Sequence, residues 1–231
     1  MLRPHICFCA AVLCLIESGS LLAVPTLRIA DGINPSILVQ DESLLDQWKG
    51  LGKEGDVVWS GKIGLWKITA LGGLTSNGNA TLPAMNLNFQ AFSSGAGTLF
   101  LSFSNDFLGP TSADVLGEYS ATVGSSSSVA FGSQFSASNV LFVGTPLMTS
   151  QAFGTGASAA ESFGSIDLPE SYSLTQAVTI VHGGKRTSSG SFHLSTTAVP
   201  DPSGTLELLM FSLTAVGIAA NRFRAKPRAA H

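Results

Sequence analysis

The amino-acid sequence predicts an all-β protein, an antiparallel β-sandwich of jelly-roll or immunoglobulin-like type. Short runs in which apolar and polar residues alternate recur from Val57 to Val199, and turn-forming Gly, Ser and Asn residues separate them. A period of two is typical of strands that bury one face and expose the other. The uncharged stretches 68–105 and 119–160 keep regularly spaced Phe and Leu, which disordered chains of similar composition lack. No clear helical pattern interrupts these runs, which favours a sandwich.

The first half of the domain contains four expected strands. Turn residues precede segments 57–59 and 63–71, and segments 85–89 and 98–103 show the clearest alternation. In the last of these, one face carries Leu99, Leu101 and Phe103, and the other carries Thr98, Phe100 and Ser102. Because the small residues 93–97 separate the last two strands, we expect a hairpin there.

The second half contains shorter expected strands at 119–123, 139–143 and 147–153, and a long final pair at 172–182 and 191–199. A loop at 183–190 joins that pair, and we expect His182 and His193 to face each other across it. Only residues 41–53 suggest a turn or two of helix, because Leu44, Leu45 and Trp48 follow a helical spacing.

The C-terminal residues 199–231 have the features of a targeting signal. Residues 206–220 are almost entirely apolar and carry one charge, Glu207, and the segment 206–223 has 18 residues. As a helix this segment would be about 27 Å long, close to the ~30 Å hydrocarbon core of a bilayer. Its polar residues form no broad face, so we expect a transmembrane helix at 205–223. The basic residues that follow favour a cytoplasmic C-terminus; they are Arg222, Arg224, Lys226 and Arg228.

A short motif, Val199, Pro200, Asp201 and Pro202, precedes the span, and the whole arrangement resembles the PEP-CTERM sorting signal of Gram-negative bacteria. The resemblance implies that the exported protein is held in the inner membrane and processed near this motif by an exosortase, a membrane-embedded protease. Asp201 stands where Glu is usual in the family, which keeps the charge and shortens the side chain. The sequence leaves open whether the tail is removed or retained.

The N-terminal residues 1–23 have the features of a secretory signal peptide. Arg3 precedes the apolar run 6–16, and small residues then allow cleavage after Ser20 or after Ala23. The apolar run is too short to span a membrane. We therefore expect a signal helix, an exported sandwich domain at 24–198 and a sorting signal at 199–231.

Composition argues against several kinds of function. All three cysteines lie in the expected signal peptide, so the exported chain offers no disulfide, Cys-ligated metal or thiol nucleophile. The chain has 12 Lys or Arg against 15 Asp or Glu, and the domain contains no basic cluster that would bind nucleic acid. It also contains no metal-ligand spacing and no serine-hydrolase motif. We expect no cofactor, no metal and no enzymatic activity.

Much of the domain resembles a recurring ectodomain of PEP-CTERM exported proteins. The likeness rests on segments 27–31, 61–65, 82–97 and 172–195. It implies a fold and a compartment and supplies no reaction. The resulting interpretation is an exported, non-enzymatic protein that is displayed at the cell surface or released into an extracellular polysaccharide matrix. Its expected partners are the exosortase, the membrane and extracellular polysaccharide.

Two alternatives stay open. A carbohydrate-binding module would stack a sugar on an exposed tryptophan; Trp48 is the candidate, because Trp59 and Trp66 lie in expected strands and belong in the core. A secreted glycosidase would need two carboxylates from distant strands. The central region offers Asp106, Asp114 and Glu118 for that role.

Overall fold

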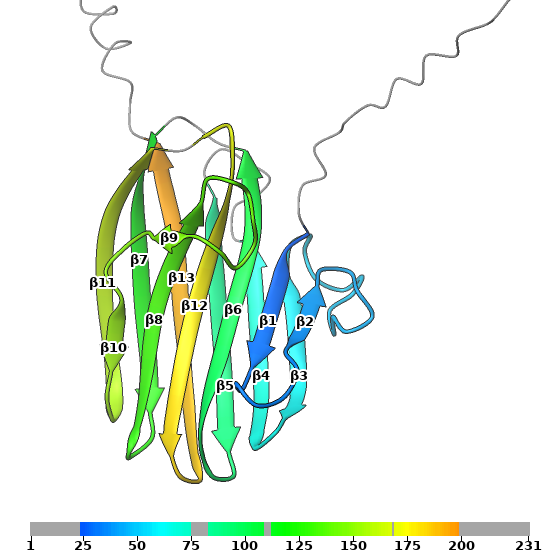
Figure 1. Cartoon of the computed structure of the whole chain (residues 1–231), viewed down its shortest axis with the longest axis vertical. Helices are drawn as coiled ribbons and strands as arrows, with labels where there is room; N and C mark the ends of the chain where they lie inside the picture. Colours follow the sequence, from blue (N-terminus) through cyan, green and yellow to red (C-terminus); the bar gives the residue numbers. More distant parts are fainter. Residues whose placement is uncertain (1–23, 75–82, 109–111, 168, 199–231) are drawn as a thin grey trace, which may run out of the picture.

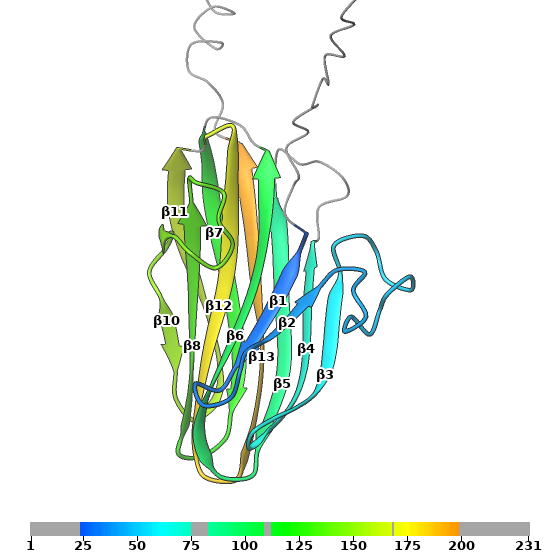
Figure 2. The same cartoon turned by 45° about the vertical axis from the view of Figure 1, so that its right-hand side comes forward.

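The computed structural model describes residues 24–74, 83–108, 112–167 and 169–198, and in these ranges the chain is built from strands and turns without a helix. Two antiparallel sheets pack face to face (Figure 1 and Figure 2). The predicted all-β sandwich is therefore confirmed. The predicted signal helix, the sorting signal and the span at 205–223 lie outside the described residues. Within the described part, no helix is long and apolar enough to cross a membrane.

The first sheet, sheet A, has the strand order β10-β8-β12-β6-β1-β2, and β9 pairs with β8 beside that path. Its strands are β1 (Thr26–Ala30), β2 (Ile37–Gln40), β6 (Ala96–Leu108), β8 (Ser127–Ser136), β9 (Thr145–Pro146), β10 (Gln151–Phe153) and β12 (Ser171–Gly183).

The second sheet, sheet B, has the strand order β11-β7-β13-β5-β4-β3. Its strands are β3 (Val57–Ile63), β4 (Trp66–Leu74), β5 (Ala84–Ser93), β7 (Ser112–Val123), β11 (Gly156–Asp167) and β13 (Arg186–Ala198).

The connections between strands correct two predicted hairpins. Strand β5 lies in sheet B and β6 in sheet A, so residues 93–97 carry the chain from one sheet to the other. The same holds for β12 and β13, and their connection is limited to Gly184 and Lys185, shorter than the expected loop at 183–190. By sequence, a short Gly- and Ser-rich connection is compatible with a hairpin and equally with an arch, which is a connection that crosses from one sheet to the other. These arches gather at the lower end of the sandwich (Figure 1).

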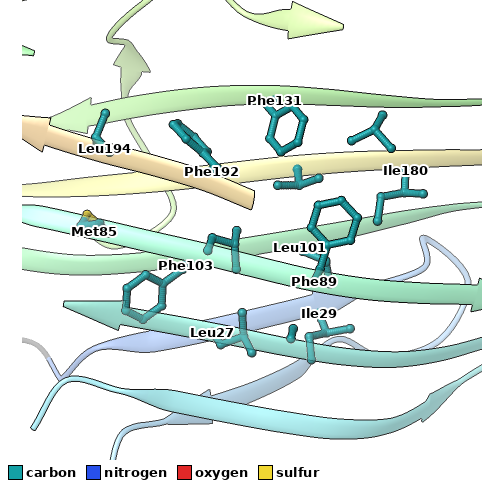
Figure 3. Packing of buried hydrophobic residues seen from close by; sticks show 14 of the residues in the cluster. Leu27, Ile29, Met85, Phe89, Leu101, Phe103, Phe131, Ile180, Phe192 and Leu194 are labelled. Atoms are coloured by element: carbon teal, nitrogen blue, oxygen red, sulfur yellow. The ribbon is translucent and has the colours of Figure 1, made fainter. Parts of the chain in front are cut away.

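The core lies between the sheets and explains the alternating pattern (Figure 3). Inward-facing residues from both sheets are buried, among them Leu101 and Phe103 of β6 and Phe192 and Leu194 of β13. Phe131 is the centre of an aromatic cluster; its ring centroid lies 5.6 Å from that of Tyr119, 5.7 Å from Phe153 and 6.0 Å from Phe192. Such aromatic contacts add to the burial of apolar area that stabilises a domain without disulfides.

Three further predictions about local structure were wrong. Residues 41–53 form successive turns and no helix. Residues 139–143 form no strand, and of 147–153 only β10 is a strand. Asn139 and Phe142 have φ angles of 56° and 62°, and this left-handed conformation cannot continue in a strand.

The two histidines of the domain do not face each other. His182 points into the core, where it is 1% exposed, and its Nδ1 and Nε2 lie 2.7 Å from Ser93 Oγ and 2.9 Å from Ser188 Oγ. His193 lies on β13 in sheet B, opposite Glu118 of the neighbouring strand β7. The expected pair was wrong because it assumed that β12 and β13 form a hairpin.

Candidate functional site

The outer face of sheet A carries a hollow of about 360 Å³ on β1, β6 and β12. Phe100 rises from its floor, with 42% of its surface exposed. Around this ring lie small and hydroxyl side chains and one cation; the lining includes Arg28, Ala30, Ser36, Ser102, Ala177 and Thr179. An exposed aromatic ring among hydroxyl groups and a guanidinium is the combination that can stack on a sugar ring and hydrogen-bond its hydroxyl groups.

Strand register explains why these side chains meet. Residues directly opposite each other in neighbouring strands lie on the same face of a sheet. Phe100 is opposite Ala30 on β1 and Thr179 on β12, and the next outward residue, Ser102, is opposite Arg28 and Ala177. Because the neighbours of Phe100 on both sides are small, its ring stands clear of them. The β1–β2 turn closes one side, and a Cβ atom added at Gly32 would lie 3.7 Å from the ring.

That turn is rigid because one buried carboxylate organises it. Asp31 accepts hydrogen bonds from the backbone N–H groups of Ile33 and Asn34 and from the Asn34 side chain, at 2.7 to 3.0 Å. Burial opposes the ionisation of Asp31, but these hydrogen bonds outweigh it and lower its pKa. Ser36, which lines one wall of the hollow, directly follows this turn in the chain.

A segment that we name the strap, residues 137–144, crosses the outer face of sheet A beside the hollow. Hydroxyl groups of the sheet hold it: Phe142 N–H donates to Ser104 Oγ at 3.3 Å, and Ser173 Oγ donates to the Val140 carbonyl at 2.8 Å. The guanidinium carbon of Arg28 lies 4.6 Å from the centroid of the Phe142 ring, a cation–π contact. The strap therefore fixes the Arg28 side chain next to the hollow. Among the described residues no carboxylate forms an ion pair with Arg28.

A second exposed aromatic side chain lies in the loop between β2 and β3, which we name the acidic loop, residues 41–56. It projects from the side of the sandwich beside β3 (Figure 2). Trp48, the candidate that the sequence offered for an exposed ring, is 42% exposed there, whereas Trp59 and Trp66 are buried. Leu44, Leu45 and Leu51 of the same loop are also exposed. Trp48 thus belongs to an apolar group without hydroxyl-lined walls, unlike Phe100.

Carboxylates hold the turns of the acidic loop. Asp46 is 5% exposed, and its oxygens accept hydrogen bonds from Trp48 N–H and Val58 N–H at 3.0 Å and from Glu42 N–H at 3.3 Å. Asp41 accepts one from Gly55 N–H at 2.8 Å. Glu42 and Asp56 accept hydrogen bonds from Gly50 N–H at 3.1 Å and Lys53 N–H at 3.3 Å, so four of the seven charged side chains in this loop bind backbone N–H groups.

The three carboxylates considered for a glycosidase do not converge. Asp106 lies on β6 in sheet A, where it accepts a hydrogen bond from the side-chain N–H group of Asn139, and it is buried. Asp114 and Glu118 lie on β7 in sheet B.

Glu118 is instead part of a small polar group on sheet B. It is directly opposite Glu161 of β11, and the two line a surface hollow of about 410 Å³. On its other side, His193 Nδ1 lies 2.9 Å from a Glu118 carboxylate oxygen. The sequence gives no sign of Glu161, because it lies 43 positions from Glu118 and only the pairing of β11 with β7 brings the two residues together. Within the described ranges, no group of three or more His, Cys, Asp or Glu side chains is placed to hold a metal ion.

The predicted sorting residues lie outside the described part of the chain. This applies to the motif residues Val199, Pro200, Asp201 and Pro202 and to the basic residues Arg222, Arg224, Lys226 and Arg228. The last described residue is Ala198 at the end of β13.

The chain matches no protein-family model and no curated protein sequence. Among solved structures it is similar to TmCBM61 in complex with β-1,4-galactotriose, at 10% identity over 58% of this chain and 90% of that one, with a TM-score of 0.31. It is also similar to infectious bursal disease virus strain Gx (13% identity, 78% and 57% covered, TM-score 0.32) and to Arthrobacter globiformis T6 isomalto-dextranase complexed with panose (13%, 75% and 30%, 0.27). These remote likenesses carry no functional weight.

The sequence pattern places Phe100 on the correct face of its strand, but it does not single out Phe100 as a binding residue. Its position on the polar face of an alternating strand predicted an exposed ring. A single large aromatic side chain among Thr98, Ser102 and small residues was the available signal. Arg28 gave no such signal, because only the β1–β6 pairing brings it to this face.

Proposed function

We propose that this chain is an exported, non-catalytic surface protein whose sandwich binds extracellular polysaccharide at the hollow around Phe100. The observation that carries the proposal is the exposed Phe100 ring within a wall of hydroxyl groups, next to Arg28, which forms no ion pair with a described residue. Trp48, the anchor expected from the sequence, is the weaker candidate, because its neighbours in the acidic loop are leucines.

The chemistry of the hollow defines the ligand. Stacking on one aromatic ring suits the apolar face of a pyranose, and Ser36, Ser102 and Thr179 can exchange hydrogen bonds with its hydroxyl groups. The Arg28 guanidinium donates hydrogen bonds and accepts none, so it favours a ligand that presents a sugar oxygen or a carboxylate to it. A polysaccharide presents this unit repeatedly, and weak single contacts then add up along the chain.

Affinity electrophoresis of the full chain through gels that contain a neutral glucan, a neutral galactan or a uronate polymer tests this function. We expect retardation by at least one of them, and a loss of about tenfold in apparent affinity for Phe100→Ala. Trp48→Ala is the matched control, because it removes an aromatic ring of equal fractional exposure elsewhere. Retardation that depends on Trp48 and not on Phe100 would move the site to the acidic loop, and no retardation by any polymer would reject carbohydrate binding.

The export part of the proposal rests on the sequence alone. The signal peptide at 1–23 and the Pro-Asp-Pro motif, span and basic tail at 199–231 support delivery through the inner membrane and processing by an exosortase-type protease. We expect Pro200→Ala combined with Pro202→Ala to leave unprocessed protein in the membrane fraction of a host with an exosortase. Asp201→Glu is the control that should be processed at least as well as the natural chain. Equal release of the double variant would refute the sorting signal.

A further inference from the structure

The edges of the two sheets differ in how well they are protected. Sheet A ends in β2 and β10, which contain four and three residues. Sheet B ends in β3, of seven residues, and β11, of twelve. Unpaired N–H and C=O groups along an edge strand are a template for another strand, and natural proteins shorten, charge, bend or cover such edges.

The β3 edge is covered by the protein itself. Gln47 of the acidic loop donates its backbone N–H to the Val58 carbonyl at 2.9 Å and its side-chain N–H to the Ser60 carbonyl at 2.8 Å. Strand β3 also carries Lys62, an exposed charge that opposes pairing with another strand. This edge is therefore closed to a partner.

The β11 edge is long and unpaired, and its only charged residues are Glu161 and Asp167. Its twelve residues pair one-to-one with β7 from Gly156–Val123 to Asp167–Ser112, so no bulge bends the strand. The strand contains neither Lys nor Pro, and no described residue pairs with its outer side. At its middle stands Phe163, 72% exposed, opposite Leu116 of β7. A long, flat edge with a central exposed aromatic side chain has the features of an interface.

The geometry points to a second copy of this chain as the partner of β11. We propose that two copies pair through antiparallel β11 strands about a two-fold axis at Phe163, which joins the two B sheets into one. In this register Phe163 lies opposite Phe163 of the second copy. Glu161 lies opposite Ser165 of that copy, and Asp167 lies opposite Ala159.

Self-complementarity of the sequence supports this register. Side chains alternate between the two faces along a strand. Outward-facing residues of β11 therefore lie opposite outward-facing residues of the second copy only if the two sequence numbers of each opposed pair add up to an even number. The axis at Phe163 meets that condition, stacks the two aromatic rings and places no carboxylate opposite another. A two-fold axis at Ser162 also meets the face condition, but it opposes each Phe163 to a Glu161 and not to the second Phe163. Both axes leave carboxylates in diagonal neighbour positions: Glu161 and Asp167 for the axis at Phe163, and the two Glu161 side chains for the axis at Ser162.

The paired strand covers nine residues, from 159 to 167, so the interface is at the small end of specific interfaces. We therefore expect reversible dimers that form at micromolar or higher concentration. Dense display on a surface would supply such concentrations. Each dimer would carry two Phe100 hollows, but the pairing does not depend on carbohydrate binding.

Disulfide trapping of the full chain tests the register directly. In a background in which Cys7, Cys9 and Cys14 are replaced by serine, Phe163→Cys places two thiols opposite each other across the axis. We expect mild oxidation to give a covalent dimer. Ser165→Cys is the matched control on the same strand and face, and its thiols stay four positions apart in register, so it should remain monomeric. Equal trapping of both variants, or trapping of the Ser165→Cys variant alone, would refute the register.

Light-scattering mass measurements on the full chain without cysteine substitutions test the dimer itself. Phe163→Lys places two like charges opposite each other, and we expect it to raise the dimer dissociation constant at least tenfold. Leu65→Lys, which changes an exposed apolar residue in the β3–β4 turn, should leave the mass unchanged. Circular dichroism verifies that both variants are folded. A natural chain that is monomeric at 100 μM, or a dimer insensitive to Phe163→Lys, would overturn the proposal.

Discussion

The imidazole of His182 lies against the indole of Trp66, with ring centroids 4.7 Å apart, at the end of the sandwich where the arches cross between sheets. The hydroxyl group of Ser93 donates to the Gly184 carbonyl at 2.9 Å and has no second proton, so it accepts from His182 Nδ1–H. Ser188 then donates to Nε2. This network joins the β5–β6 and β12–β13 arches and holds the imidazole in its neutral Nδ1–H form.

Stability should depend on pH through this side chain. Burial, with a smaller contribution from the Arg186 charge, lowers the pKa of His182 in the folded chain. The unfolded chain therefore binds a proton first as the pH falls through about 6.5, so the free energy of unfolding decreases below that pH and is fully present above it. We expect chemical denaturation to show a lower free energy of unfolding at pH 5.5 than at pH 7.5. The difference should shrink in His182→Gln and persist in His193→Gln; an unchanged difference in His182→Gln would contradict the assignment.

Gly72 on β4 is required because the Phe103 ring of the opposite sheet occupies the space of a side chain. A Cβ atom at Gly72 would overlap that ring. We expect Gly72→Ala to lower the free energy of unfolding by about 1–3 kcal/mol, the usual effect of overpacking a core. Gly154→Ala, where nothing lies within 4 Å of the added atom, should change it by less than about 0.5 kcal/mol. Urea denaturation measures both.

Asp46 should be the main stabilising residue of the acidic loop. Asp46→Ala removes the acceptor of three backbone N–H groups, and hydrogen bonds to a charged group contribute about 1.5–3 kcal/mol. We expect a loss of about 2 kcal/mol and faster proteolytic cleavage within 41–56. Glu54→Ala is the control in the same loop. Equal protease resistance of natural chain and Asp46→Ala would show that other contacts hold the loop.

Phe142 should act on the hollow through Arg28. Phe142→Ala removes the ring under the guanidinium, a contact worth about 0.5–1 kcal/mol at an exposed site. We expect a two- to fivefold loss of polysaccharide affinity and little change in unfolding. Phe142→Leu keeps the bulk of the strap and tests whether the aromatic ring is needed. A full loss of binding in both variants would indicate that the strap itself contacts the ligand.

The sequence predicted what depends on local pattern. Alternation of Leu99, Leu101 and Phe103 with Thr98, Phe100 and Ser102 assigned both faces of β6 correctly, and the burial of Trp59 and Trp66 followed from their strands. Register and sheet membership are non-local, and no pattern within a strand encodes them. The local pattern therefore predicts hairpins where the chain crosses between sheets, and it places His182 on the surface. The predicted strand at 139–143 fails for a local reason, the left-handed φ angles of Asn139 and Phe142.

The end of β13 at Ala198 and the arches lie at opposite ends of the sandwich (Figure 1). Strand β13 has thirteen residues from Arg186 to Ala198, a span of roughly 40 Å. The Phe100 hollow lies toward the arch end, beside Thr179 and Ala30. If the tail holds the molecule at a membrane, the length of the sandwich separates the hollow from the lipid by a few nanometres, because the hollow lies toward the end opposite Ala198.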